Sequence, residues 1–391
     1  MIISTSIDIP LQCDESPISC SACVKRGTRC SFRPPSPLQS PTLSCIIPGQ
    51  VGGTLDLELL HNFSTKTCVS ITDHASLQQF YRTDFISEAL KSGFLLRCLL
   101  ALSAFHLADQ NRELLDAVDE EQKPAILSKT KGYLAAAHGH YNAGLSSFRD
   151  KLQNITSENC HALFGCSCLI AMTSFAQSCD GVRSVTERIY SLDANQESGF
   201  SIIKWILLVR GVKTVRDAAQ DWIHSGPMSP IRENSGNEGY KQDAGQVDED
   251  ITLYLDKLST AIRHHSDPDG ADTCIAAITL LRKSFAGVAC GCDFSVVFMW
   301  PVHVKAHFID MLESNRSEAL VVLASFCVLL HTQNWRWWIK GWSSNMFNAI
   351  EGNVDKLWKP WLAWPLQVIE DGDARQAKNS IPVVTEGICC Q

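Results

Sequence analysis

The sequence has 391 residues, of which 45% are hydrophobic and 19% are charged, and its formal net charge is -8. This amount of apolar material is enough for one large core or two smaller ones. The acidic balance excludes a protein that attracts nucleic acid over its whole surface. Any contact with DNA must therefore come from a local basic patch.

The first residues show no features of a secretory signal peptide, because Met1–Pro10 has neither a basic start nor a long apolar run. The most apolar stretches, Phe94–Ala108 and Leu320–Leu330, are too short to span a bilayer. We therefore expect an intracellular protein without a membrane span. Its 17 cysteines are predicted to be reduced thiols rather than a disulfide framework.

Four cysteines lie within residues 1–30, with the spacing Cys13-x6-Cys20-x2-Cys23-x6-Cys30. A gap of two residues lets a short turn direct two thiolates at one metal ion, and zinc favours four thiolates in a tetrahedron. By spacing alone, a zinc site and a chance arrangement in a cysteine-rich chain remain equal alternatives.

Residues 31–53 contain five prolines followed by three glycines, which predicts a linker that cannot form a regular helix. Beyond the linker, apolar residues recur at helical spacing over residues 54–366, and residues 367–391 are predicted to be a flexible tail. Strands with alternating β-branched residues are scarce. The predicted fold class is therefore all-α.

The first predicted helix begins at Leu55. The later ones cover Phe94–Asp109, Lys123–Leu152, Ser157–Phe175, Glu197–Ser225, Ile251–His265, Asp272–Ala289, Val296–Glu313, Glu318–His331 and Trp335–Ile350. Residues 232–250 are polar and acidic and predict a loop.

Eight of the ten tryptophans lie between Trp300 and Trp364. Such an aromatic concentration is consistent with a pocket for a rigid apolar ligand. It is also what helix packing produces when each indole ring is buried and its N–H is paired. We favour packing, and no individual pocket residue can be named from the sequence.

Signals for catalysis are weak. His303 and His307 have helical i, i+4 spacing, but Val304 stands where the zinc-protease motif has glutamate. The acidic run Asp248–Asp250 resembles one half of a magnesium site of a prenyl-converting enzyme, but no second acidic motif accompanies it. The phosphate-binding Gly-x4-Gly-Lys and the nucleophile elbow Gly-x-Ser-x-Gly are absent from the sequence. We expect no enzyme activity, with an all-α prenyl-converting enzyme as a distant alternative.

The cysteine spacing resembles the fungal binuclear zinc cluster, in which six cysteines hold two zinc ions. Cys13, Cys20, Cys23 and Cys30 correspond to the third to sixth cysteines of that pattern, with Pro17 in the intervening loop. The resemblance implies zinc as the cofactor, DNA as a partner and a nuclear location.

The first two cysteines of the family pattern and its first basic helix are missing, because Met1–Gln12 contains no cysteine, histidine or basic residue. In the family that helix reads base edges, so direct readout is predicted to be lost and the zinc site to be incomplete. Lys25, Arg26 and Arg29 are predicted to contact the DNA backbone only, which adds affinity without sequence information. A start assigned too late and a truncated product both explain the pattern.

The helical part is similar to the regulatory domain of sterol uptake control protein-like regulators. The segments that carry the similarity include Leu57–Phe63, Phe94–Ala108, Leu207–Val212 and Trp361–Pro365. The resemblance implies an all-α effector domain of a regulator of RNA polymerase II genes, for sterol or secondary-metabolite pathways. Its implied partners are an apolar small molecule and the transcription machinery. The alternative is a protein of the same ancestry that does not bind DNA and acts through a ligand or partners.

Overall fold

The computed structural model describes residues 53–379 apart from 116, 183–189, 192–199 and 234–246. The cysteine cluster, the linker and the basic residues Lys25, Arg26 and Arg29 lie outside the described residues. The described residues belong to the helical unit that begins at Val51. Within it almost every element is a helix, which confirms the all-α prediction.

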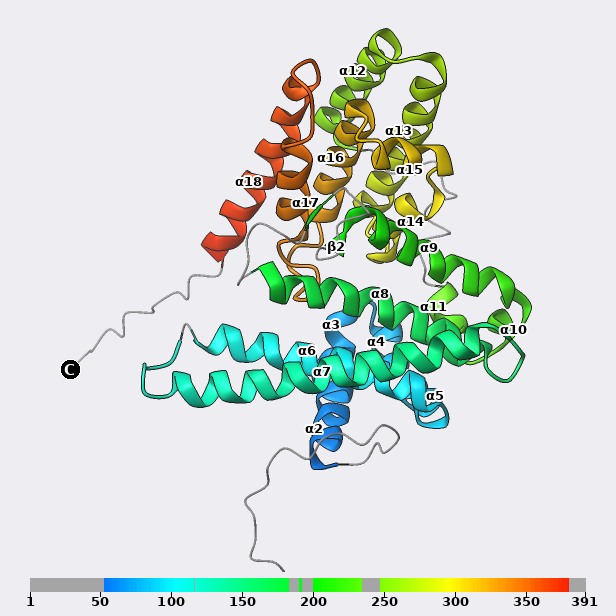
Figure 1. The fold of residues 1–391 in the computed structure, drawn as a ribbon, viewed down its shortest axis with the longest axis vertical. Coiled ribbons are helices and arrows are strands. Elements are labelled where there is room, and N and C mark those ends of the chain that lie inside the picture. The colour runs from blue at the N-terminus through cyan, green and yellow to red at the C-terminus, as the bar shows by residue number, and fades with distance from the viewer. Residues whose placement is uncertain (1–52, 116, 183–189, 192–199, 234–246, 380–391) are drawn as a thin grey trace, which may run out of the picture. The chain divides into compact units, whose positions relative to one another are not determined.

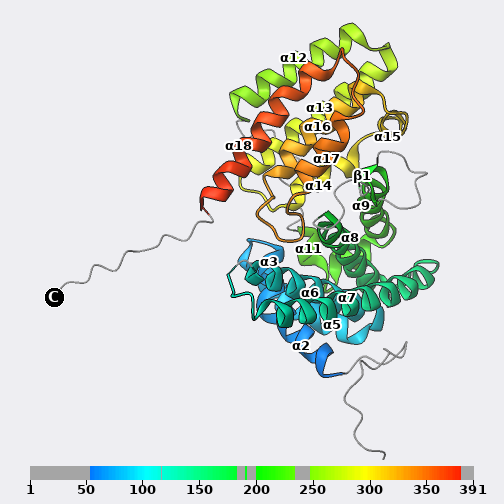
Figure 2. The same ribbon diagram turned by 60° about the vertical axis from the view of Figure 1, so that its left-hand side comes forward.

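The N-terminal group of elements is built around a long helical hairpin, α6 and α7, which lie side by side in Figures 1 and 2. Its elements are α2 (Thr54–Asn62), the π-helix η1 (Phe63–Thr67), α3 (Cys68–Ile71), α4 (Ala75–Arg82), α5 (Asp84–Lys91), α6 (Gly93–Leu115), α7 (Lys123–Leu152) and α8 (Cys160–Val182).

Helix α6 is apolar around its circumference, and an unbroken run from Cys98 to His106 is buried. A helix without a polar face is stable only where other helices cover it on all sides, and α2, α5, α7 and α8 do so. Helix α7 begins at Lys123 as predicted, with Pro124 in its first turn, where the missing N–H costs no hydrogen bond.

The C-terminal group follows α9 (Ile202–Ala218) and the short helices α10 (Gln220–Ser225) and α11 (Ser229–Glu233). Its elements are α12 (Glu249–His265), α13 (Pro268–Ala289), α14 (Ser295–His303), α15 (Ala306–Glu313), α16 (Ser317–His331), α17 (Trp342–Glu351), the 3-10 helix η2 (Lys359–Leu362) and α18 (Ala363–Asn379). Two short strands, β1 (Tyr190–Ser191) and β2 (Phe200–Ser201), form a parallel pair before α9.

Helix α16 lies at the centre of the C-terminal group, among α13, α17 and α18 (Figure 2). Every residue of α16 except His331 is buried. Two tryptophans flank it and pair their indole N–H groups: Trp300 donates to the Ala277 carbonyl at 2.9 Å and Trp342 to the Phe175 carbonyl at 3.1 Å. This is the packing arrangement that we favoured for the tryptophan concentration.

Several predicted boundaries were wrong. The single helix predicted over Val296–Glu313 is two helices, because Val304 is extended and separates α14 from α15. The helix predicted from Trp335 begins at Trp342, after Gly341 with a positive φ of 82°, a conformation that favours glycine. The short helices α4 and α5 were not predicted.

The acidic run Asp248–Asp250 was predicted to lie in a loop but starts α12. The Asp248 carboxylate accepts a hydrogen bond from the Asp250 N–H at 2.8 Å and caps the helix. At the C-terminal end, α18 continues to Asn379, beyond the predicted domain boundary at residue 366.

One described segment, Cys160–Gln177 of α8, is long and apolar enough to cross a membrane by length and composition. Most of that segment (83%) is buried inside the helical unit, which is the environment of a core helix.

Candidate ligand pocket

A cavity of about 160 Å³ lies between α4, α8, α9 and α14. Helix α9 lines it with Val209, Val212, Lys213 and Arg216. Residues at these spacings of three and four project from one face of a helix. The same face of α9 therefore presents two apolar and two cationic side chains to the cavity.

The remaining walls of the cavity are largely apolar. Helix α8 contributes residues at helical spacing, and α4, α14 and the segment after α16 complete the lining. The apolar and aromatic residues of these walls are Leu77, Tyr81, Phe164, Cys168, Ala171, Met172, Phe175, Ile231, Phe294, Phe298, Met299, Val302 and Trp338. Of the ten tryptophans, Trp338 is the one that lines this cavity.

One carboxylate, Asp293, lines the cavity although only 7% of the residue is exposed. It accepts hydrogen bonds from the Thr72 hydroxyl at 2.8 Å and from the Ser295 N–H at 3.1 Å. The bond to Thr72 joins the start of α14 to the segment between α3 and α4. Because both oxygens are hydrogen-bonded, the buried charge is stabilised within the protein.

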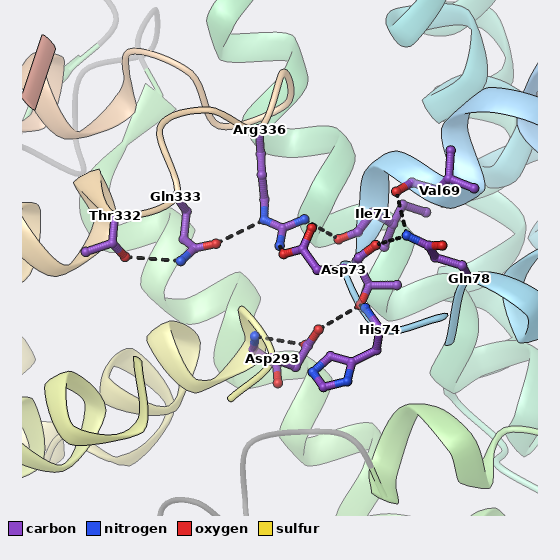
Figure 3. A network of polar contacts seen from close by, with 11 residues as sticks. Val69, Ile71, Asp73, His74, Gln78, Asp293, Thr332, Gln333 and Arg336 are labelled. Atoms are coloured by element: carbon purple, nitrogen blue, oxygen red, sulfur yellow. Dashed lines mark hydrogen bonds and ion pairs between the residues drawn. The ribbon is translucent and has the colours of Figure 1, made fainter. Parts of the chain in front are cut away.

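A second buried ion, Arg336, joins the same two parts of the fold (Figure 3). It donates to Asp73 Oδ2 at 2.6 Å, to the Ile71 carbonyl at 2.9 Å and to Gln333 Oε1 at 3.0 Å. Its guanidinium also lies 4.7 Å from the centre of the Phe294 ring. Arg336, Asp293 and Thr72 thus form a polar wall beside the cavity that links N-terminal and C-terminal helices.

The cations on α9 have a different environment. Lys213 pairs with Asp217 one turn later, and Arg216 donates to Asp217 Oδ1 through Nε at 3.1 Å and Nη2 at 3.0 Å. The Lys213 side chain is 36% exposed and the Arg216 side chain 18%. Burial raises the pKa of Asp217, while the hydrogen bonds from Lys213 and Arg216 lower it, and the net shift is downward.

Burial keeps two titratable groups of the cavity, Tyr81 and Cys168, in their neutral forms. Burial raises the pKa of Tyr81 well above its usual value, and the nearby Cys168 and Asp293 add to the shift. Burial also raises the pKa of the Cys168 thiol to about 12, an effect that a hydrogen bond from Ser167 and the positive charge of Arg216 oppose. Tyr81 and Cys168 are therefore neutral at physiological pH, and Arg216 lies close to the cavity wall.

The dimensions limit what the cavity holds. Its volume of about 160 Å³ is close to the ~150 Å³ of an engineered apolar cavity that binds benzene. Pockets for drug-sized ligands measure roughly 300–1,000 Å³. A small apolar molecule fits this cavity as it stands, whereas a rigid sterol nucleus requires it to widen.

A second cavity, of about 360 Å³, lies within the C-terminal group between α12, α13, α16 and α18. Its apolar lining is interrupted by His331 and by the exposed carboxylates of Asp248 and Asp371. It involves none of the N-terminal helices, so we take the first cavity as the candidate site.

The histidine pair that was weighed in the sequence does not form a site. His303 and His307 lie on different helices, α14 and α15, where His303 Nδ1 lies 2.9 Å from the Met299 carbonyl and His307 pairs with Asp269 at 3.2 Å. Among the residues that the structure describes, no group of three or more histidine, cysteine or acidic side chains is arranged to hold a metal ion. The predicted zinc ligands Cys13, Cys20, Cys23 and Cys30 lie outside the described residues.

Sequence reasoning missed the α9 cavity face. The sequence did contain a signal for this face. Val209 and Val212 belong to the apolar stripe of a helix, and Lys213 and Arg216 have the helical spacing that places two cations on the same stripe.

The helices on one side of this cavity are similar to a known protein family. Residues 58–191 match the fungal specific transcription factor domain. The matched residues include α4 and α8, which form two walls of the cavity, while α9, α14 and Trp338 follow the matched region.

Two curated relatives extend the similarity over most of the chain. A Zn(2)-C6 fungal-type transcription factor of Gibberella zeae is 21% identical over 342 residues, which is 82% of this chain and 63% of that protein. The Zn(2)-C6 fungal-type transcription factor afumD of Aspergillus fumigatus is 26% identical over 346 residues, 80% of this chain and 79% of that protein. The chain thus spans less than two thirds of the length of the first relative. The similarity supports a relationship to fungal transcription factors.

Proposed function

We propose that this chain is a nuclear transcription regulator whose helical domain responds to an apolar small molecule bound in the cavity at α9. The observation that carries the proposal is the position of the cavity. Its walls come both from the fungal specific transcription factor domain and from the helices that follow it. A ligand held there contacts both parts at once.

The physical basis of such a response is differential binding. A ligand stabilises the arrangement of α4, α8, α9 and α14 that encloses it, and it shifts the population only as far as its affinities for the two arrangements differ. The bonds of Thr72 to Asp293 and of Arg336 to Asp73 join the same elements beside the cavity. A ligand that stabilises these contacts changes the surface that the domain presents to the transcription machinery.

The N-terminal cysteines complete the proposal. Cys13, Cys20, Cys23 and Cys30 supply four thiolates, the number that fills one tetrahedral zinc site. Lys25, Arg26 and Arg29 lie within and next to this cluster and supply phosphate contacts. Target genes for sterol or secondary-metabolite pathways are the class implied by the sequence resemblance.

A second candidate function is a regulator that binds ligand or partner proteins without reading DNA itself. It is favoured by the net charge of -8, which gives the chain as a whole no attraction for DNA. Zinc content of the purified full chain separates the two: one zinc ion that is lost in the variant Cys20→Ser/Cys23→Ser supports the four-thiolate site. A chain that holds no zinc and binds no DNA supports the second candidate.

The ligand response is tested with the full chain fused to an unrelated DNA-binding domain that drives a reporter gene. Ala171 lines the cavity from α8, so Ala171→Phe fills part of the space. Ala135→Phe, at an exposed position of α7, is the matched control. We expect Ala171→Phe to change reporter output and Ala135→Phe to leave it unchanged. Equal reporter output from the unmodified fusion, Ala171→Phe and Ala135→Phe, with equal amounts of folded chain, contradicts the proposed role of the cavity.

A further inference from the structure

The two cations at the cavity point to the chemical class of its ligand. Lys213 and Arg216 lie on the cavity-lining face of α9 beside Val209 and Val212, and their side chains are 36% and 18% exposed. Their single anionic partner among the described ion pairs is Asp217, which is not part of the cavity lining. The lining itself therefore has an excess of positive charge on this side.

Donor capacity remains at both cations. An arginine has five N–H donors and a lysine three. Arg216 uses Nε and Nη2 to bind Asp217, and no hydrogen bond from its Nη1 is found within the described residues. A planar carboxylate matches the fork geometry of a guanidinium, and a bond between two ions is about twice as strong as a neutral one.

The polar wall formed by Arg336, Asp293 and Thr72 does not compete for the same ligand group. Both oxygens of Asp293 already accept hydrogen bonds, and Arg336 has three hydrogen-bond partners on the protein. Lys213 and Arg216 are the cations of the cavity lining, and Asp293 is its one carboxylate, so a negative head group is attracted to α9 rather than to Asp293.

We infer that the ligand is a small amphipathic monocarboxylic acid. Its apolar part occupies the cavity among Phe164, Met172 and Phe298, and its carboxylate binds Arg216 and Lys213. The volume of about 160 Å³ corresponds to an aromatic ring or a chain of about six to ten carbon atoms. This inference rests on the proposed function, because it specifies the ligand of the same cavity.

A head-group series tests the inference: octanoate, octanol and octylamine share one chain and carry a negative, a neutral and a positive head at pH 7. Binding to the full chain is measured by isothermal titration calorimetry. We expect octanoate to bind about tenfold more tightly than octanol, the effect of one charge-assisted hydrogen bond. Octylamine should bind least.

The variant Lys213→Gln/Arg216→Gln should remove the preference for octanoate and leave octanol affinity within about twofold, since the apolar walls are unchanged. Lys204→Gln/Arg210→Gln is the matched control, because it removes the same charge from another face of α9. This control should retain the preference. Thermal melting of each variant verifies that it is folded.

The remaining outcomes distinguish the inferred carboxylic acid from the proposed function on which it rests. Equal binding of octanoate and octanol, or tighter binding of octylamine, overturns the carboxylic acid but leaves an apolar ligand cavity in place. A preference for octanoate that survives in the Lys213→Gln/Arg216→Gln variant places the acid elsewhere and overturns the inference. If octanoate, octanol and octylamine all fail to bind and Ala171→Phe leaves the reporter output unchanged, the proposed function is overturned as well.

Discussion

The two charged walls of the cavity differ in how their ions are paired. On one wall, Arg336 and Asp293 are buried and bind partners from distant parts of the chain. On the other, Lys213 and Arg216 are partly exposed and pair with a residue of their own helix. Buried ions with several distant partners fix the fold, whereas partly exposed ions with a local partner remain available to a ligand.

The largest effect is expected for Arg336→Ala. The substitution removes a fully buried side chain, leaves the Ile71 carbonyl without its donor and separates Asp73 from its partner. We expect the free energy of unfolding to fall by about 4 kcal/mol, from the cavity and the lost hydrogen bonds together. Denaturant unfolding followed by circular dichroism measures it. Arg82→Ala, on the exposed side of α4, should cost less than about 0.5 kcal/mol; an equal loss in both variants contradicts the role of Arg336.

A pH effect of similar size is expected from His106, which stacks on Trp337 with ring centres 4.5 Å apart. Burial, with a smaller effect of the Lys66 charge, lowers the pKa of His106 from 6.5 to about 4. Because the folded-state pKa is the lower one, protonation favours unfolding. The stabilisation is present above pH 6.5 and is lost as the pH falls towards 4, by on the order of 3 kcal/mol.

The measurement is the free energy of unfolding from pH 7.5 to pH 4.5 for the unmodified protein and for His106→Asn. The decline should be steeper in the unmodified protein, since the asparagine variant lacks this titration. Parallel curves show that His106 does not contribute.

A smaller loss is expected for Asp293→Asn, which keeps the shape of the side chain but removes its charge. The bond from the Thr72 hydroxyl then ends on a neutral acceptor. We expect a loss of about 1.5 kcal/mol in the free energy of unfolding. The exposed Asp310 of α15 is the control site, where Asp310→Asn should be neutral within about 0.5 kcal/mol. A neutral Asp293→Asn shows that the polar wall does not depend on this carboxylate.

The smallest effect on stability is expected at the ligand-facing wall. Lys213→Gln/Arg216→Gln removes partly exposed ion pairs within one helix, and such pairs contribute roughly 0–1 kcal/mol. Thermal melting should be almost unchanged while octanoate binding is lost. A loss of stability comparable to that of Arg336→Ala erases the distinction between the two walls.

Helices were predictable from the sequence where the local signal was long. Helix α7 has both predicted ends, and the apolar segments at α6, α13 and α16 lie where periodicity placed them. The predicted helix ends were wrong where contacts outside the helix determine the backbone conformation, as at Val304 between α14 and α15 and at Gly341 before α17. The four zinc ligands and three DNA-contacting residues remain predictions, because they lie outside the described residues.

The sequence by itself determined the helical class, the cysteine spacing and the relationship to fungal transcription factors, because these depend on residues close together in the chain, while the linker at residues 31–53 remains a prediction. Only the tertiary structure decided the cavity and its two walls. Thr72, Tyr81, Cys168, Arg216 and Asp293 are far apart in sequence, and packing of α4, α8, α9 and α14 brings them to one place. The periodicity of apolar residues shows which face of a helix is apolar. It does not show which other helix packs against that face or which charged residues share its cavity.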